Sequence, residues 1–150
     1  MRAPDLERYL HDHIPLARAM QVTVCRLDAA GVTLGAPLAA NINHHATVFG
    51  GSASAVAILA GWSLTHVRLA EAGIPNRLVI QRNTMHYERP IAGEFAAVAY
   101  PPDTEAWGFF VRTLLRKGRA RLGVVCELEY QGATAGRLDA DYVAMRINDR

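Results

Sequence analysis

The stretch Asn43–Ala72, NHHATVFGGSASAVAILAGWSLTHVRLAEA, carries the strongest structural pattern in this chain. A polar loop leads into the pair Gly50-Gly51, and the pair leads into a run rich in Ala, Val, Leu and Ser. A helix over residues 52–72 would be about 31 Å long, and its two charged residues both lie near its C-terminal end. Because a helix that is apolar on nearly all sides belongs inside a fold, the stretch predicts a buried helix whose N-terminus opens onto a polar loop.

The composition is that of a folded globular protein. The 150 residues are 51% apolar and 20% charged, which argues against a disordered chain, and their number suits one domain over residues 1–150. The formal net charge of +2 is too small to indicate nucleic-acid binding. The densest basic stretch is short and lacks the interleaved aromatic residues of such sites, so we expect no nucleic-acid partner.

Three features predict a cytoplasmic protein that does not enter a membrane. Residues 1–16 carry charges throughout and lack the apolar core of a signal peptide. Residues 52–69 reach the length of a membrane span, but they include several polar side chains, and the sequence holds no second span. Cys25 and Cys126 lie in apolar, strand-like segments and are expected to be small buried side chains in a reducing compartment; a disulfide between them is the alternative.

Periodicity and turn residues predict one helix and two strands before the long helix, and four strands with one inserted helix after it. The expected elements are helix 5–13, strands 20–27 and 32–36, helix 52–72, strands 77–88 and 94–100, helix 104–115, and strands 120–130 and 134–147. Pro15 is expected to end the first helix, and Gly73 to cap the end of the long one. Strands joined by short turns, with helices segregated to one side, make an α+β fold in which a single sheet surrounds the long helix.

The chain resembles hot-dog fold thioesterases. The pattern N-x6-G-G (Asn43, Gly50, Gly51) opens the long helix, and the following strand ends in Y-x-x-P (Tyr87, Pro90). The segment Arg116–Arg146 resembles the last long hairpin of these proteins. More narrowly, HIPLARAM (13–20), TLGAPLAANINHHATVFGGS (33–52) and LAGWSL (59–64) resemble the thioesterase-type domain often fused behind a GNAT acetyltransferase. The resemblance covers nearly the whole chain and implies a hot-dog fold.

In this family an acyl-CoA or acyl-carrier thioester binds at a dimer interface, with its carbonyl at the N-terminus of the central helix. The resemblance therefore implies that Gly50, Gly51 and Ser52 present free N–H groups and a positive dipole end to a developing oxyanion. The alternative is that the glycines only permit a tight turn into the helix. Asn43 matches the family's loop asparagine, which would orient the attacking water or the thioester; the alternative is a local cap of the loop backbone.

The neighbouring polar residues have two interpretations each. His44 or His45 would serve as general base because imidazole titrates near neutral pH, or each would bond only to the loop backbone. Being adjacent, the two rings are expected to point in different directions. Thr47 and Ser52 would bond to substrate or cap the helix start, and capping is favoured for Ser52.

The long helix lacks one family feature. Many hot-dog thioesterases carry an acidic residue one or two turns past the glycines, and residues 57–61 contain none. The resemblance then implies that the base comes from the loop or from the strand 77–88. On that strand we expect the alternating residues Val79, Gln81, Asn83, Met85 and Tyr87 to share one face and His86 the other, with Gln81, Asn83 and His86 as weak candidates for the base.

A basic cluster follows the second predicted helix: Arg116, Lys117, Arg119 and Arg121. Such residues bind the phosphates of CoA or of a carrier protein, and the alternative is a solvated start of a strand. We expect no metal and no cofactor other than the CoA of the substrate. The leading hypothesis is an acyl-CoA or acyl-carrier thioester hydrolase acting as a homodimer or a dimer of dimers. The rival is a non-catalytic acyl- or CoA-binding or dimerisation module of the same fold.

Overall fold

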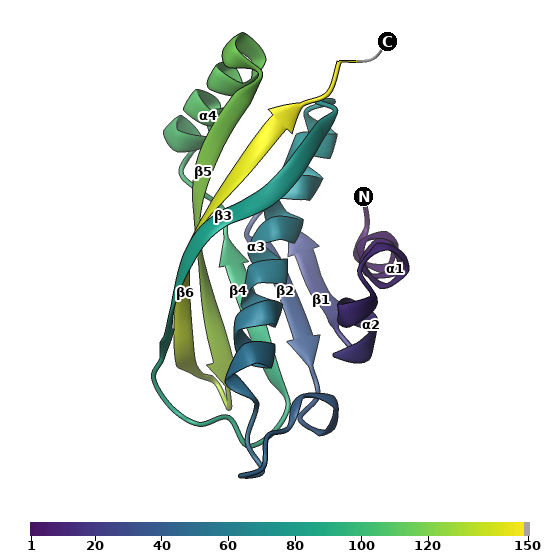
Figure 1. Cartoon of the computed structure of the whole chain (residues 1–150), viewed down its shortest axis with the longest axis vertical. Helices are drawn as coiled ribbons and strands as arrows, with labels where there is room; N and C mark the ends of the chain where they lie inside the picture. Colours follow the sequence, from purple (N-terminus) through teal and green to yellow (C-terminus); the bar gives the residue numbers. More distant parts are fainter. Residues whose placement is uncertain (149–150) are drawn as a thin grey trace.

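The computed structural model describes residues 1–148 and shows a six-stranded antiparallel sheet wrapped around one long helix (Figure 1). The strand order is β1-β2-β4-β5-β6-β3. The elements are α1 Ala3–His13, α2 Pro15–Ala19, β1 Thr23–Asp28, β2 Gly31–Ala36, the 3-10 turn η1 Ala39–Asn41, α3 Gly50–Glu71, β3 Asn76–Tyr87, β4 Phe95–Tyr100, α4 Thr104–Lys117, β5 Arg119–Tyr130 and β6 Ala133–Arg146. This is the α+β hot-dog fold that the sequence predicted; the expected domain end at residue 150 lies outside the described residues.

The long helix α3 packs inside the curved sheet. It contacts strands β2, β3, β4, β5 and β6, and its inward side chains join the hydrophobic core (Figure 1). The hydroxyl of the buried Tyr142 on β6 donates to the Ile58 carbonyl at 2.5 Å. Among residues 1–148, α3 is the one helix with the length and hydropathy of a membrane span, and these contacts show that it is the core helix of the fold.

One stripe of α3 is not buried, contrary to the expectation of a helix covered on all sides. Ala55, Ile58, Trp62 and His66 are partly exposed, whereas Val56, Ala57, Ala60 and other inward residues are buried. The exposed positions recur every three or four residues, so they form one continuous line along the helix. The sheet therefore wraps around α3 without closing over it.

The central bend of β3 changes the expected faces of this strand. The register with β6 shifts between Ile80 and Arg82, so Gln81 is an extra residue in a β-bulge. Past the bulge the alternation is reversed: Asn83 and Met85 pair with the buried Ala140 and Leu138. The prediction that Val79 and Gln81 share a face with these residues is therefore wrong, because a single inserted residue switches all later side chains to the opposite side.

Several predicted boundaries move by one to three residues. The first helix ends at His13, as expected from Pro15, but Pro15 also occupies the first turn of a short helix α2 that the sequence did not predict, where its missing N–H costs nothing. The strand expected from Met20 begins at Thr23, since Gln21 adopts a left-handed turn with φ 55°. The long helix begins two residues earlier than predicted, at Gly50. Gly73, with φ 69°, follows its last turn as expected.

The two cysteines are free, and one of them is not buried. Cys126 lies in the core, and burial raises the pKa of its thiol to about 12. Cys25 is exposed on the edge strand β1, which corrects the expectation of two buried side chains. The alternative of a disulfide between them does not apply to this structure.

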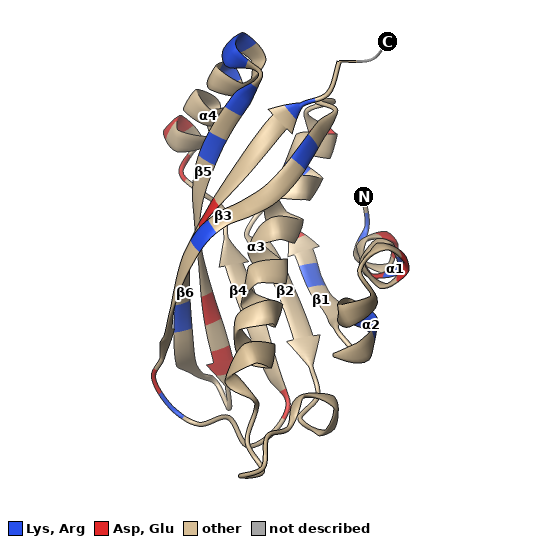
Figure 2. Ribbon diagram, viewed as in Figure 1, with Lys and Arg blue, Asp and Glu red and all other residues tan. Residues whose placement is uncertain are grey.

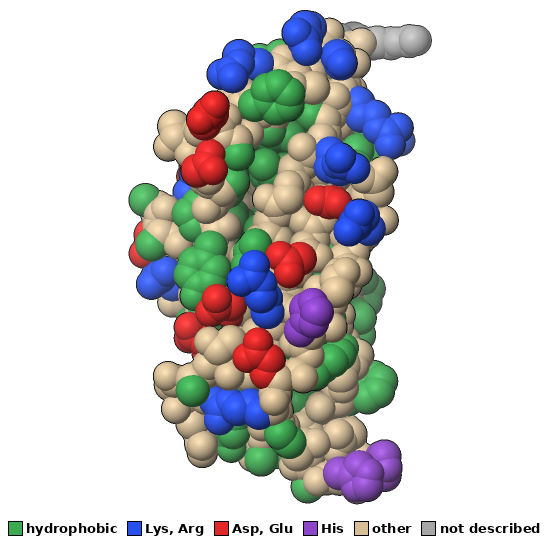
Figure 3. Space-filling model, turned by 90° about the vertical axis from the view of Figure 1, so that its left-hand side faces the viewer, with side chains coloured by type: hydrophobic (Ala, Val, Ile, Leu, Met, Phe, Trp, Pro, Cys, Tyr) green, Lys and Arg blue, Asp and Glu red, His purple; other side chains and the backbone are tan. Residues whose placement is uncertain are grey.

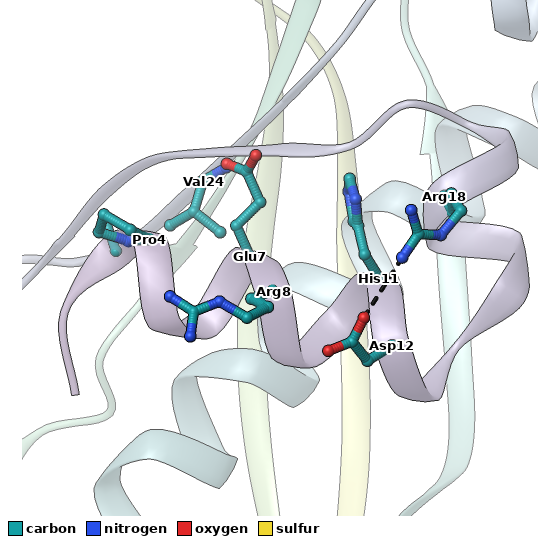
Figure 4. A pocket seen from close by; sticks show the side chains of 8 residues that line it. Pro4, Glu7, Arg8, His11, Asp12, Arg18 and Val24 are labelled. Atoms are coloured by element: carbon teal, nitrogen blue, oxygen red, sulfur yellow. Dashed lines mark hydrogen bonds and ion pairs between the residues drawn. The ribbon is translucent and has the colours of Figure 1, made fainter.

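The two edges of the sheet are treated differently. Along the start of β1, side chains of α1 take the outward backbone groups: Glu7 accepts from the Val24 N–H at 2.9 Å, and His11 Nε2 donates to the Val22 carbonyl at 2.6 Å. Figure 4 shows Glu7 and His11 projecting from α1 toward this strand. Among the described residues, no strand pairs with the outer edge of β3. The β3 edge is thus open to a further strand.

Replacing Gly61 by alanine tests the contact between α3 and β6. A Cβ at this position would lie 2.5 Å from the Tyr142 hydroxyl, so the substitution forces the ring or the helix to shift. We expect a loss of about 1–3 kcal/mol in the free energy of unfolding, measured with denaturant. Gly123→Ala is the control, because its Cβ would meet only Asp141 at 3.6 Å and should leave stability nearly unchanged. Equal stability of the two variants would contradict the close packing described for Tyr142.

Candidate active site

The N-terminus of α3 has free backbone donors. The N-cap residue Phe49 offers no side-chain hydrogen bond, and the first N–H bonded within the helix pattern is that of Ala53, to the Phe49 carbonyl at 3.0 Å. The N–H groups of Gly50, Gly51 and Ser52 have no acceptor among the described residues. These donors and the positive helix end form a site suited to negative charge. Ser52 is the third helical residue, so the prediction that it caps the helix is wrong.

The two glycines have different surroundings. A Cβ on Gly51 would lie 2.4 Å from the Phe49 ring, so only glycine leaves room for this ring where it packs. A Cβ on Gly50 would meet the Tyr87 ring at 3.5 Å, which is ordinary contact. The Tyr87 hydroxyl donates to the Gly50 carbonyl at 3.0 Å and so ties the helix start to the end of β3. This bond gives the Tyr of the Y-x-x-P motif a positioning role at the helix end.

Asn43 organises the loop before α3. Its Oδ1 accepts from the N–H groups of His45 at 2.8 Å and Thr47 at 3.1 Å, and its Nδ2 donates to Thr47 Oγ1 at 2.8 Å. These bonds hold a tight turn in which Ala46 has φ 61°. The geometry matches the local-cap interpretation of Asn43. Thr47 takes part in the same turn, and its hydroxyl hydrogen is not used by the bond from Asn43.

The buried amide beside this loop belongs to Asn41, which the sequence analysis did not single out. The side-chain Nδ2 of Asn41 donates to the backbone carbonyls of Met20 at 2.9 Å and Pro37 at 2.8 Å. The backbone carbonyl of Asn41 accepts from the Phe49 N–H at 2.8 Å. Asn41 therefore fixes the segment that leads into α3. Its burial is the signal that identifies it, and burial of a loop residue is not readable from sequence spacing.

His44 and His45 lie at the exposed tip of the loop. Their ring centroids are 3.8 Å apart, so the two rings contact each other, and the expectation that they point in different directions is wrong. Figure 3 shows histidine side chains together at one extremity of the molecule. Among the other candidates for a base, His86 pairs with Arg137 on the outward-facing register of β3, whereas Asn83 faces the core side of the sheet.

A cleft of about 350 Å³ opens next to the start of α3. It is lined by residues from the loop, the helix, the end of β3 and the turn that follows: Thr47, Val48, Ala53, Tyr87, Glu88, Arg89, Pro90, Ile91, Leu128 and Ala135. Glu88 is the one carboxylic acid among them. It lies inside the Y-x-x-P motif, where sequence reasoning treated it as an unspecified residue. The cleft thus contains a carboxylic acid, whereas the first turns of α3 contain none.

On the exposed stripe of α3 lies a second, apolar groove of about 250 Å³. Its walls come from the α1–α2 segment, from α3 and from β3, and every lining side chain is hydrophobic: Ile14, Leu16, Met20, Ala55, Ile58, Leu59, Trp62 and Ile80. Trp62 is held in place because its Nε1 donates to the Leu78 carbonyl at 3.0 Å.

Trp62 is the first of four aromatic rings that form a stack. The Trp62 and His66 centroids are 4.6 Å apart, those of His66 and Tyr9 4.8 Å, and those of Tyr9 and His13 4.1 Å. The stack joins α1 to α3. Burial, together with the neighbouring His13, lowers the pKa of His66, so the neutral ring is favoured within the stack.

The basic cluster lies at the opposite end of the molecule from the N-terminus of α3 (Figure 2). Arg116 and Lys117 belong to the last turn of α4, which is two residues longer than predicted. Lys117, Arg119 and Arg121 line a recess of about 340 Å³ together with the bulge residue Gln81. Along β5, about 30 Å separates Arg119 from Leu128, which lines the cleft at the helix start. Within one chain the cluster and the free N–H groups are therefore far apart.

Comparisons with known proteins agree with this architecture. A protein of unknown function from Chlorobaculum tepidum has 25% sequence identity and a TM-score of 0.92, over 97% of this chain and 94% of that one. A probable thioesterase from Pseudomonas aeruginosa has 21% identity and a TM-score of 0.81, over 96% of each chain. A thioesterase from Haemophilus influenzae shares the fold at 10% identity and a TM-score of 0.79, over 100% of this chain and 94% of that one.

The family model described as "Putative thioesterase (yiiD_Cterm)" matches residues 3–146, which include every helix and strand of the structure. The match spans the loop, the glycine pair, the cleft and the basic cluster in one continuous segment. The chain therefore belongs to the yiiD C-terminal family of thioesterase-type hot-dog proteins.

Proposed function

We propose that the protein hydrolyses acyl-CoA or acyl-carrier thioesters, with the thioester carbonyl at the N-terminus of α3. The observation that carries this proposal is the set of three N–H groups, of Gly50, Gly51 and Ser52, without acceptors among the described residues. In the tetrahedral intermediate the carbonyl oxygen becomes an anion, and preorganised donors at a helix end stabilise that anion more than the neutral carbonyl. This intermediate forms when water adds to the thioester carbon and gives up a proton to a base; its collapse breaks the C–S bond and releases the free acid and the protonated thiol.

Glu88 is the group we propose as general base. It lies in the cleft that also contains Thr47 and Ala53, next to the helix start. A carboxylate there accepts a proton from water as the water attacks the thioester carbon. Asn43 and Thr47 support the reaction by holding the loop, since their side chains bond to each other and to the loop backbone.

The site is proposed to form in a homodimer joined through β3. The β1 edge is already occupied by Glu7 and His11, whereas the β3 edge is open. Antiparallel pairing of β3 with β3 of a second copy would continue the sheet across a two-fold axis.

Such pairing would bring the basic cluster of one copy to the helix start of the other. β3 begins beside the cluster, because Arg77 and Arg119 both pair with Met145, and it ends at Tyr87, which bonds to Gly50. Antiparallel pairing would lay the Tyr87 end of one copy beside the Arg77 end of its partner. The Arg119 of that partner would then lie two strands beyond its Arg77, and so about 15 Å from the strand that carries Tyr87. We propose that Arg116, Lys117 and Arg119 bind the phosphates of the CoA whose thioester lies at the other copy's helix.

A proline at Gly50 tests the role of the free donors. Position 50 is the first residue of α3, where proline suits the helix, and Phe49 before it has the extended ψ of 131° that proline requires of its neighbour. Gly50→Pro removes one N–H, and Gly50→Ala adds a Cβ but keeps the N–H. With the acyl-CoA that gives the highest rate in a panel of short, medium, long and aromatic chains, we expect kcat to fall about 100- to 1,000-fold for proline and little for alanine. Equal rates for the two variants, or no hydrolysis of any substrate by the native protein, would reject the proposal.

Glu88→Gln tests the base. We expect kcat to fall strongly while KM and the melting temperature change little, because glutamine keeps the shape of the side chain and loses its basicity. Glu71→Gln is the matched control, since Glu71 is the one acidic residue of α3 and lies exposed at its far end. Unchanged kcat in the Glu88 variant would remove Glu88 from the mechanism.

Mixed dimers test the sharing of the site between copies. The Gly50→Pro chain and a chain carrying Lys117→Glu and Arg119→Glu should each be poorly active alone. Co-expressed with different affinity tags and purified through both, they should regain activity, because one of the two sites then has an intact helix end and an intact cluster from the other chain. Absence of recovery in a dimer verified by light scattering would show that the cluster does not serve the partner's site. A strictly monomeric protein would count against the whole arrangement.

A further inference from the structure

The apolar groove runs in line with the free N–H groups. Gly51, Ala55, Ile58 and Trp62 follow one another at intervals of four, three and four residues, so they lie on one stripe of α3. The exposed Phe49 ring rests over Gly51 at the start of this stripe. A molecule whose carbonyl lies at the helix start therefore has the groove directly beside it.

The lining selects an apolar occupant. Every side chain of the groove is hydrophobic, and the single polar atom of the Trp62 ring is already bonded to the Leu78 carbonyl. A polar group placed there would lose its hydrogen bonds to water without replacing them, which disfavours its binding. An alkyl chain gains free energy for each methylene that it buries. The groove runs along α3, between Ile80 of β3 and the α1–α2 segment, and this elongated course suits a linear chain.

Trp62 stands at the far end of the groove. It is the lining residue of α3 furthest from the helix N-terminus, its ring is fixed by the bond to β3, and the stacked rings of His66 and Tyr9 stand behind it. A chain that follows the stripe from Gly51 meets this ring before it can pass α1.

We propose that the groove binds the acyl chain of the thioester and that Trp62 sets the greatest length of chain accepted; this inference rests on the function proposed above. From Gly51 to Trp62 the helix rises about 16 Å, of which the ring itself takes a few ångströms. An extended chain advances about 1.2 Å per bond, so about ten carbons fit. The substrate class is therefore a medium-chain acyl thioester of about ten carbons.

Two opposite substitutions test the length limit. Trp62→Ala opens the end of the groove and should shift the chain length of highest kcat/KM upward by at least two carbons. Ile58→Trp places a ring one turn nearer the helix start, about 6 Å, and should shift it downward by about five carbons. Both are measured on saturated acyl-CoAs of 4 to 16 carbons, with circular dichroism as the check of folding. If Trp62→Ala does not fold, Ile58→Trp decides alone. An unchanged length profile in the folded variants overturns the inference.

Binding separates this inference from the hydrolase function. In a Trp107→Phe protein, Trp62 is the one tryptophan left, so its fluorescence reports on the end of the groove. Decanoyl-CoA should change its emission, and butyryl-CoA, too short to reach the ring, should not. Length-dependent emission without hydrolysis would support the groove and reject the enzyme. Hydrolysis of decanoyl-CoA with no change in emission would reject the groove and leave the enzyme. The absence of both overturns the inference.

Discussion

The packing of α3 against the concave side of the sheet is the constraint on which the rest of the structure depends. A helix of 22 residues rises about 33 Å, and the long strands β3, β5 and β6 have the 12 to 14 residues needed to run beside it. A flat sheet could not enclose a cylinder, and the register shifts in the β1–β2, β3–β6 and β5–β6 pairs supply local bends. The bond from Tyr142 to Ile58 and that from Tyr87 to Gly50 attach the helix to two strands along its length.

This packing determines where chemistry is available. Because α3 is fixed by its buried side, its N-terminus projects into the loop region without a side-chain cap, and three N–H groups stay free. Its outward stripe stays apolar, since the same residues that make the helix suitable for a core also line the groove. The free N–H groups, the cleft that contains Glu88 and the apolar groove thus all border α3, and their positions depend on where this helix packs. The charged cluster is the exception, because it is set by α4 and the start of β5.

The sequence predicted the fold because its signals were local and strong. The apolar run after Gly50-Gly51 and the alternating strands needed no knowledge of distant contacts, and helix, sheet and topology class were confirmed. The bulge at Gln81 was missed because one extra residue in a strand leaves no mark on composition. The short helix α2 that begins at Pro15 was missed, since proline both ends helices and starts them, and only the neighbouring backbone decides.

The candidate site was less accessible to sequence reasoning. Gly50 and Gly51 follow from the motif, and their N–H groups have no acceptor among the described residues, while their role in catalysis stays a prediction. Glu88 and Asn41 depend on which residues meet across the fold, so neither spacing nor residue type revealed them. The distance between the basic cluster and the helix start likewise depends on the extended course of β5 across the sheet, which residue spacing alone does not give. The roles of Asn43, His44, Thr47 and Ser52 in catalysis stay predictions.

The covering of β1 by α1 has a consequence for how many copies can join. A sheet with two open edges would add molecules at both sides and grow without limit. Glu7 and His11 bond to outward backbone groups at the start of the β1 edge. The β3 edge, in contrast, is open to a further strand. The dimer proposed above, paired through β3, would then not extend through the start of its β1 edges. A chain without α1 would have an open β1 edge as well as an open β3 edge. The proposed pairing could then continue from copy to copy and form a polymer.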